Sequence, residues 1–217
     1  VNISNNIRDK PIMEIGAGTG NLTIEILKKN PKKIIAIEKD KNLSISLKNR
    51  FINYKNLKII NDDIINILTT KNLEKGVIIF GNLPYNISTK ILASLIMLKK
   101  WPPWYESLIL MFQKEVADRI LAKTGTKEFG RLAILCNWRM EIKKQFDVSR
   151  NCFYPRPKVN STMLSFLPKK EVKYKIKNPK NLEMITRVLF SNRRKMINKS
   201  LIKLFGKNIS LIKNLNL

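Results

Sequence analysis

Three glycines recur at every second position directly after a short apolar run near the N-terminus. The segment reads MEIGAGTG over residues 13–20 and contains Gly16, Gly18 and Gly20. Glycine lets the backbone turn tightly and approach a ligand with no side chain in the way. The spacing is one residue shorter than the GxGxxG of dinucleotide-binding loops, and an ordinary tight turn between strand and helix is the alternative explanation. We predict that the three glycines lie against a bound ligand.

Polar side chains stand at the ends of the next three apolar runs. Glu38 closes the second run, where a carboxylate can accept both hydroxyls of a ribose, and Asp63 follows the third, where a carboxylate can accept an adenine amino group. Asn82 follows the fourth run, in the segment GNLPY. Ligands of open α/β sheets bind at the carboxyl ends of the strands. Each acid alone is more often a solvated loop residue, but with the glycines the set predicts a nucleoside pocket.

The elements that must position these residues alternate regularly along the first 115 residues. Because strand–helix alternation produces a parallel sheet with helices on both faces, we predict an α/β fold. The expected strands are Ile12–Ile15, Lys33–Glu38, Leu57–Ile60, Val77–Gly81 and Leu108–Phe112. The expected helices, each with apolar residues at helical spacing, are Asn21–Lys29, Lys41–Phe51, Ile64–Leu68, Ser88–Leu98 and Gln113–Lys123.

The second half of the chain is less regular. The segment Leu132–Trp138 fits either a helix or a buried strand, whereas Glu141–Val148 and Asn160–Leu167 alternate as strands and are expected to extend the sheet in antiparallel pairing. A charged connector then ends in a proline, and two helices follow at Leu182–Phe190 and Arg194–Phe205. We therefore divide the chain into a catalytic domain (1–170), a connector (171–178) and a small basic helical domain (179–217).

The charge of the chain predicts an anionic partner. Its 217 residues carry 42 Lys+Arg against 16 Asp+Glu, a formal net charge of +26. Lys195, Lys199 and Lys203 recur every fourth residue opposite apolar positions, which on a helix makes a basic stripe able to follow phosphates. A general bias of the source genome toward lysine explains part of the excess, and a membrane surface is a rival partner. Nucleic acid is the partner that we favour.

Several classes of site are excluded by composition. The chain has no histidine and two cysteines, Cys136 and Cys152, without metal-site spacing. Histidine-ligated zinc, histidine-based catalytic triads and a disulfide framework are therefore excluded, and we expect no metal. No apolar run approaches the ~18 residues of a membrane span, and neither a signal peptide nor a transit peptide is recognisable.

The ordered motifs EIGAGTG, AIEKD, NDD and GNLPYN resemble those of class I S-adenosylmethionine methyltransferases that act on exocyclic amines. More narrowly, the chain resembles the bacterial small-subunit (16S) rRNA adenine N6,N6-dimethyltransferases, the kasugamycin-sensitivity enzymes. The resemblance continues over nearly the whole chain, through FQKEVADRI at 112–120, FGRL at 129–132, FYPRPKVNS at 153–161 and FSNRRK at 190–195.

The resemblance implies a Rossmann-like fold with a mostly parallel seven-stranded sheet, plus a small C-terminal helical domain. It implies S-adenosylmethionine as the cofactor, held by Gly16, Glu38, Asp63 and Asn82, with S-adenosylhomocysteine as the product. The implied reaction is dimethylation of two adjacent adenines near the 3′ end of small-subunit rRNA. The small ribosomal subunit would be the partner of a cytoplasmic, monomeric enzyme. The residues expected to bind RNA are Arg193, Arg194, Lys195, Lys199 and Lys203.

The chemistry of such a reaction asks for hydrogen-bond acceptors around the adenine amine. Its nitrogen is a poor nucleophile because the lone pair is delocalised into the ring, and acceptors for its hydrogens favour the transition-state geometry. Asn82 and a backbone carbonyl from Leu83 or Pro84 supply two acceptors, and proline holds that backbone rigid. Tyr85 would stack on an extruded base, and Phe153 is a candidate for a second stacking face or else a core aromatic. No general base is required.

Two departures and three alternatives accompany this interpretation. Family members carry a GQNFL-like segment before the first strand, which residues 1–11 lack, and the C-terminal domain is expected to be incomplete at Leu217.

One alternative is the large-subunit rRNA methyltransferase of macrolide resistance, whose motif usually has isoleucine where this chain has Leu83. A second is an assembly factor with a vestigial site. A Rossmann dehydrogenase, the third, leaves the NLPY segment unexplained and is rejected.

Overall fold

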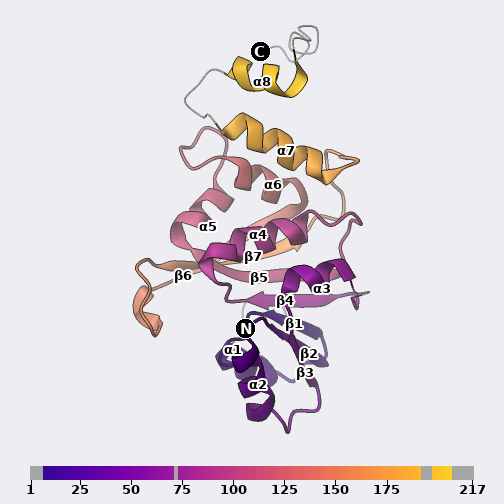
Figure 1. Ribbon diagram of the computed structural model, residues 1–217, viewed down its shortest axis with the longest axis vertical. Coiled ribbons are helices and arrows are strands. Elements are labelled where there is room, and N and C mark those ends of the chain that lie inside the picture. The colour runs from indigo at the N-terminus through magenta and orange to yellow at the C-terminus, as the bar shows by residue number, and fades with distance from the viewer. Residues whose placement is uncertain (1–6, 71–72, 192–196, 207–217) are drawn as a thin grey trace.

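The computed structural model describes residues 7–70, 73–191 and 197–206 and contains a seven-stranded sheet (Figure 1). The strand order is β3-β2-β1-β4-β5-β7-β6, and β1 to β5 all pair in parallel. This order confirms the predicted mostly parallel sheet. The strands are β1 (Pro11–Ile15), β2 (Lys33–Glu38), β3 (Leu57–Asn61), β4 (Val77–Gly81), β5 (Tyr105–Gln113), β6 (Met140–Val148) and β7 (Ser161–Pro168).

The last two strands extend the sheet in the predicted antiparallel way, but with an inverted order. β7 lies between β5 and β6 and is antiparallel to both, so β6 runs parallel to β5 at the edge of the sheet. A register shift between Lys144 and Phe146 interrupts the β6–β7 ladder. The insertion of β7 places Ser161, its first residue, opposite Gln113 at the end of β5.

Helices cover the sheet on both faces and agree with the predicted ones to within a few residues. They are α1 (Asn21–Leu27), α2 (Lys41–Arg50), α3 (Ile64–Thr70), α4 (Tyr85–Ile96), α5 (Lys114–Leu121), α6 (Arg131–Arg139), α7 (Pro179–Phe190) and α8 (Ile197–Phe205). The ambiguous segment Leu132–Trp138 is helical and forms most of α6. The expected helix Arg194–Phe205 is described from Ile197 onward as α8.

Two separate apolar cores follow from the alternation of side chains along the strands. On one face, Met13 and Ile15 of β1 pack in a cluster that includes side chains of α3, α4, α5 and α6. On the other face, Ile12 packs in a cluster that includes Ile26 of α1 and Leu47 of α2. Because successive residues of a strand point to opposite faces, the apolar strands β1 and β4 are buried on both sides.

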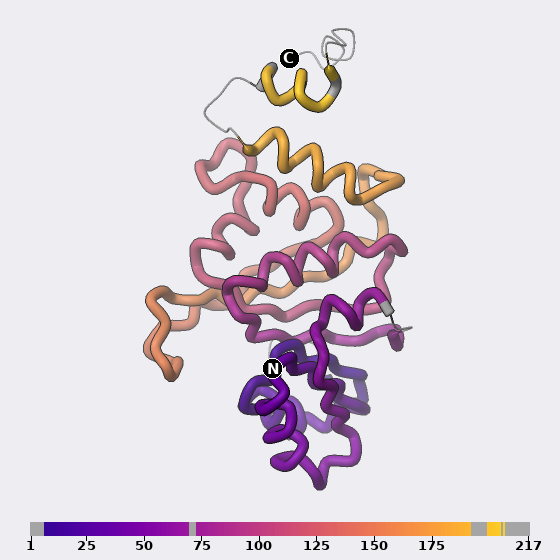
Figure 2. Tube along the Cα trace, viewed as in Figure 1, coloured from indigo at the N-terminus to yellow at the C-terminus, as the bar shows by residue number. Residues whose placement is uncertain are grey.

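The C-terminal helices stack beyond α6 (Figures 1 and 2). α7 begins with Asn178 as its N-cap and Pro179 in its first turn, so the predicted boundary proline lies inside the helix. Arg131 Nη2 lies 2.6 Å from Glu183 Oε1, and the rings of Phe129 and Phe190 meet edge to face, which fixes α7 against α6. α8 contacts α7 in turn. The division into domains at 170 and 179 remains a prediction.

Candidate active site

The glycine loop turns the chain from β1 into α1 with three left-handed residues. The φ angles of Gly16, Gly18 and Gly20 are 72°, 57° and 85°, a region that L side chains rarely adopt. Gly20 is also closely packed, because a Cβ there would lie 2.5 Å from Cε2 of Phe51. A Cβ on Gly18 would meet no atom within 4 Å. The loop therefore leaves open space at Gly18 and contacts the end of α2 at Gly20.

Glu38 is held at the end of β2 by two backbone donors. Its Oε2 accepts a hydrogen bond from the Gly18 N–H at 2.8 Å, and its Oε1 accepts one from the Asp40 N–H at 2.9 Å. Only 8% of Glu38 is exposed. The carboxylate is thus fixed directly beside the glycine loop, and each oxygen keeps a lone pair for a ligand hydroxyl.

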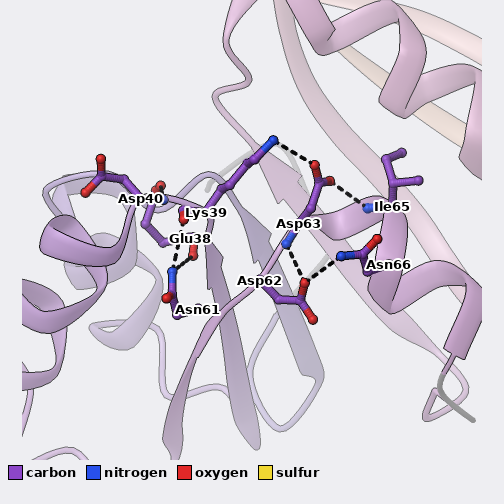
Figure 3. A network of polar contacts seen from close by, with 8 residues as sticks. All are labelled: Glu38, Lys39, Asp40, Asn61, Asp62, Asp63, Ile65 and Asn66. Carbon is purple, nitrogen blue, oxygen red and sulfur yellow. Dashed lines mark hydrogen bonds and ion pairs between the residues drawn. The ribbon is translucent and has the colours of Figure 1, made fainter.

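The end of β3 contributes a second fixed carboxylate (Figure 3). Asp63 Oδ1 accepts from the Ile65 N–H at 2.9 Å, and Asp63 Oδ2 lies 3.1 Å from Lys39 Nζ. The backbone hydrogen bond first, and the Lys39 charge in addition, lower the pKa of Asp63. Asn61 bridges the two strands by donating to the carbonyls of Glu38 and Lys39. Asp63 therefore stands ionised at the same edge of the sheet as the Glu38 carboxyl group.

These residues line one cavity of about 500 Å³. Hollows of similar volume occur elsewhere on the described part of the chain, but this one collects the strand ends singled out in the sequence. Of the predicted site residues, those that line it are Gly16, Gly18, Glu38, Asp63, Asn82, Pro84 and Phe153. Gly20, Leu83 and Tyr85 lie outside the lining.

The NLPY segment presents acceptors at the cavity edge. α4 begins at Tyr85, and the Pro84 carbonyl accepts from the N–H groups of Ile87 and Ser88 in its first turn. Among the described residues, no backbone N–H donates to the Leu83 carbonyl, and no hydrogen bond is formed by the exposed Asn82 side chain. The two free acceptors are therefore Asn82 Oδ1 and the Leu83 carbonyl, which favours the Leu83 carbonyl of the two that the sequence left open.

Side chains on either side fix this segment. The Leu83 side chain is 2% exposed and packs so closely that a Cβ on Gly81 would lie 2.9 Å from its Cδ2. The Tyr85 hydroxyl lies 2.7 Å from Oγ of the fully buried Ser161, at the start of β7. Phe153 is half-buried at the cavity and belongs to neither apolar core. This position of Phe153 favours a stacking role over the alternative that it is an aromatic residue of the core.

The sequence interpretation missed a third carboxylate in the cavity. Glu14, in the middle of β1, is 1% exposed and accepts from Thr23 Oγ1 of α1 at 2.6 Å. Burial raises the pKa of Glu14 to about 7, and the neighbouring Glu38 charge adds to the shift. The signal was present, since an acid inside an otherwise apolar strand directly before a glycine loop has no water to solvate it.

The predicted RNA-binding residues are only partly placed. Lys199 and Lys203 are exposed on α8, whereas Arg193, Arg194 and Lys195 lie outside the described residues. No helix in the described ranges is long and apolar enough to cross a membrane. Within the same ranges, no cluster of acidic or sulfur side chains is arranged to hold a metal ion.

Comparison with known proteins places these features in one family. Residues 1–215 match the family model described as ribosomal RNA adenine dimethylase. The chain is 48% identical to a ribosomal RNA small subunit methyltransferase A of Pelagibacter ubique over 94% of this chain and 78% of that protein. A Rhizobium etli protein of the same name is 38% identical over 91% of this chain and 72% of its own length.

Two solved structures of RNA methyltransferases are similar to this chain. A dimethyladenosine transferase from Plasmodium falciparum superposes with a TM-score of 0.71 at 29% identity, covering 97% of this chain and 76% of that one. The 23S rRNA methyltransferase ErmE shares the fold with a TM-score of 0.69 at 24% identity, covering 91% of this chain and 77% of that one. The fold is therefore the Rossmann-like one of class I methyltransferases. This chain belongs to the ribosomal RNA adenine dimethylase family.

Proposed function

We propose that this enzyme uses S-adenosylmethionine to dimethylate N6 of two adjacent adenines near the 3′ end of small-subunit rRNA, releasing S-adenosylhomocysteine. The observation that carries the proposal is the pair of free acceptors, Asn82 Oδ1 in the lining of the cavity and the Leu83 carbonyl next to it in the chain. Relatives up to 48% identical bear the small-subunit name, which favours this substrate over large-subunit rRNA.

The cavity fits the cofactor chemically. Glu38 offers two fixed oxygens for ribose hydroxyls, and Asp63 offers an ionised acceptor for an adenine amino group. The left-handed backbone at Gly16 and Gly18 keeps side chains away from the ligand. In its ionised form, the buried Glu14 would provide an anion for the cationic amino group of the methionine end. When bound, the cofactor supplies a sulfonium methyl group, which is electrophilic.

The protein's contribution at the adenine is to shape and hold the nucleophile. Asn82 Oδ1 and the Leu83 carbonyl would accept the two hydrogens of N6 and draw its lone pair out of conjugation with the ring. As the N–C bond forms, the C–S bond breaks and the nitrogen gains positive charge, so a proton leaves to water without a dedicated base. Because the reacting atoms must align, positioning supplies most of the rate.

Two aromatic residues would hold the base in place. Tyr85 is fixed through Ser161, and Phe153 stands at the cavity in the segment after β6. An adenine taken out of its stack can rest against such faces, which compensates for part of the lost stacking in RNA. The backbone of the rRNA would be held by cations such as Lys199 and Lys203. We place the reaction in the cytoplasm, on a monomeric enzyme that needs no metal.

The test is transfer of labelled methyl groups from S-adenosylmethionine to unmethylated small subunits, with large subunits and naked DNA in parallel. We expect label in small-subunit rRNA alone, and its loss in Asn82→Ala. Asn86→Ala is the matched control, because Asn86 is an equally exposed asparagine in the first turn of α4. Label in large subunits would assign the macrolide-resistance activity instead. Tight small-subunit binding without any label would identify an assembly factor.

A further inference from the structure

A second hollow, of about 580 Å³, lies at the other end of α4 from the NLPY segment. Three elements meet there: the loop after α4, the end of α6 and the link between β7 and α7. In Figure 1 that link and the loop joining β6 to β7 lie at opposite sides of the sheet. The lining of the hollow includes Trp101, Trp138, Arg139, Lys170, Tyr174 and one acidic residue, Glu171.

A buried guanidinium stands at the base of this hollow. Arg139 is 5% exposed, and its guanidinium carbon lies 4.6 Å from the ring centre of Trp101 and 4.0 Å from that of Trp138. Arg139 Nη1 donates to the carbonyls of Ile96 and Leu98, both at 2.8 Å. Its Nε is buried without a hydrogen-bond partner, and no carboxylate pairs with it among the described residues. The base of the hollow therefore contains a positive charge that two indoles and two carbonyls stabilise and that no carboxylate of the described residues neutralises.

The rim adds further positive charge. Residues 169–177 read KKEVKYKIK, with five lysines and one glutamate. Lys170, Lys175 and Lys177 line the hollow, and none of them has an ion pair within the described part of the chain. Elsewhere, lysines such as Lys114 and Lys144 are paired with an aspartate on their own element. An anion entering the hollow would thus meet cations that the protein itself does not neutralise.

An exposed aromatic ring stands on the same rim, with Lys173 Nζ over one face at 5.4 Å from the ring centre, so a base would stack on the other face. Tyr174 is 65% exposed, yet its backbone is fixed, because Trp138 Nε1 donates to its carbonyl at 2.8 Å. Trp101 Nε1 holds the same link by donating to the Lys169 carbonyl at 2.9 Å. The ring is presented on an anchored segment rather than on a free tail. An exposed aromatic beside unpaired lysines is the combination that binds single-stranded nucleic acid without reading its sequence.

We propose that this hollow binds an unpaired nucleotide of an RNA strand, with its base against Tyr174 and its phosphate at the lysines, above the buried charge of Arg139. This inference rests on the proposed function in one respect, which is that the RNA is rRNA. An acidic peptide would satisfy the lysines but would leave Tyr174 without a role. α4 separates the hollow from Asn82 by about 18 Å, given its 12 residues at ~1.5 Å each. A nucleotide bound there contributes to substrate binding and takes no part in methyl transfer.

The experiment measures binding of a fluorescent oligouridylate by anisotropy, since uridine lacks the adenine amine that Asn82 and Leu83 would hold. Tyr174→Ala should weaken binding at least about fivefold, the lower end for one stacked base. Lys170, Lys175 and Lys177 changed together to glutamine should reduce the salt slope of log K by about two. Photo-crosslinks from 4-thiouridine in the same oligonucleotide should fall within residues 169–177.

The matched control changes Lys48, Lys55 and Lys58 to glutamine, because these are equally exposed lysines on and after α2 with no ion pair among the described residues. An equal loss of affinity in both triple variants would overturn the proposal, as the effect would then be that of net charge. Binding of polyglutamate with the same dependence on Tyr174 would also overturn it. In methyl transfer, Tyr174→Ala and the triple lysine variant of the hollow should each have a higher KM for small subunits and an unchanged kcat. Because oligouridylate binding is measured without methyl transfer, its outcome does not depend on whether the proposed activity is found.

Discussion

The cofactor side and the acceptor side of the cavity are built in opposite ways. At the ends of β2 and β3, both carboxylates are already held by backbone N–H groups, which fixes them before any ligand arrives. At the end of β4, Asn82 Oδ1 and the Leu83 carbonyl have no partner in the described chain. The difference teaches that rigid groups suit a ligand held throughout the reaction, whereas acceptors needed most in the transition state are left free.

The largest effect is expected from a substitution on the acceptor side of the cavity. Asn82→Ala should lower kcat for methyl transfer about a thousandfold, because one preorganised partner of the developing charge is lost. Glu38→Gln should instead weaken cofactor binding about tenfold or more and affect kcat less, because it removes a charged acceptor of the bound ligand. Single-turnover transfer and calorimetric titration with S-adenosylmethionine separate the two effects. If Asn82→Ala weakens cofactor binding as much as Glu38→Gln, the contrast between the two sides is wrong.

The next largest effect is expected in the glycine loop, where Gly20 is closely packed and Gly18 faces open space. Gly20→Ala should reduce the free energy of unfolding by about 3 kcal/mol, because the new methyl group meets Phe51 and the backbone keeps a left-handed φ. Gly18→Ala meets no neighbour within 4 Å and should cost about 1–2 kcal/mol for the same backbone strain. Urea unfolding measures both. Gly18→Ala should nevertheless weaken cofactor binding more, and the reverse ranking in stability would show that Gly20 is not a packing residue.

A third effect appears in the pH dependence of stability. The pKa of Glu14 rises from 4.5 to about 7 on folding, so the folded state retains a proton that the unfolded chain releases. Its contribution is present in full below pH ~4.5 and is lost as the pH rises through about 7, up to about 3 kcal/mol in all. Glu14→Gln should remove this loss, so the variant should gain stability relative to the wild type above pH 7. Urea unfolding of both proteins between pH 4 and 8 measures the difference. An unchanged pH curve in Glu14→Gln would show that folding does not raise the pKa of Glu14.

The smallest effect is expected at Ser161, which holds the Tyr85 hydroxyl in place. Ser161→Ala removes the hydrogen bond to the Tyr85 hydroxyl and should cost about 1 kcal/mol of transition-state stabilisation, which is a fall of about fivefold in kcat/KM. Ser165→Ala is the control on the same strand, because it loses a hydrogen bond to Gln145 away from the cavity. Steady-state transfer to small subunits measures both variants. Equal falls would show that the loss comes from β7 as a whole.

Much of the fold follows from periodicity alone. The apolar runs before Gly16, Glu38 and Asn82 end where the observed strands end, because two-sided burial requires continuous apolar sequence. The position of β7 between β5 and β6 was not predictable, since strand pairing depends on contacts far apart in the sequence. The segment Leu132–Trp138 was ambiguous because the polar residues of α6 do not mark an exposed face: Arg139, the last residue of the helix, is buried against two indoles.

The site was predicted as a set of positions, and the roles of its members remain proposals. Spacing predicted that Glu38, Asp63 and Asn82 meet at one edge, and the structure brings them to one cavity. Two details needed coordinates. The choice of the Leu83 carbonyl over that of Pro84 depends on the first turn of α4, which begins three residues before the predicted helix. The apolar residues around Glu14 in β1 indicate its burial, but the hydrogen bond from Thr23 Oγ1 of α1 is visible only in the structure.

The late position of β7 in the chain has a consequence for synthesis on the ribosome. When residues up to Gln113 have emerged, five parallel strands are available, and β5 is an open edge with unpaired backbone groups. β6 emerges next but has no partner in the final sheet until β7 follows. A chain stalled before residue 161 therefore exposes an edge that can pair with another copy, and it lacks the Ser161 that anchors Tyr85. Translation must reach the last strand before the protein gains either a closed sheet edge at β5 or a complete active site.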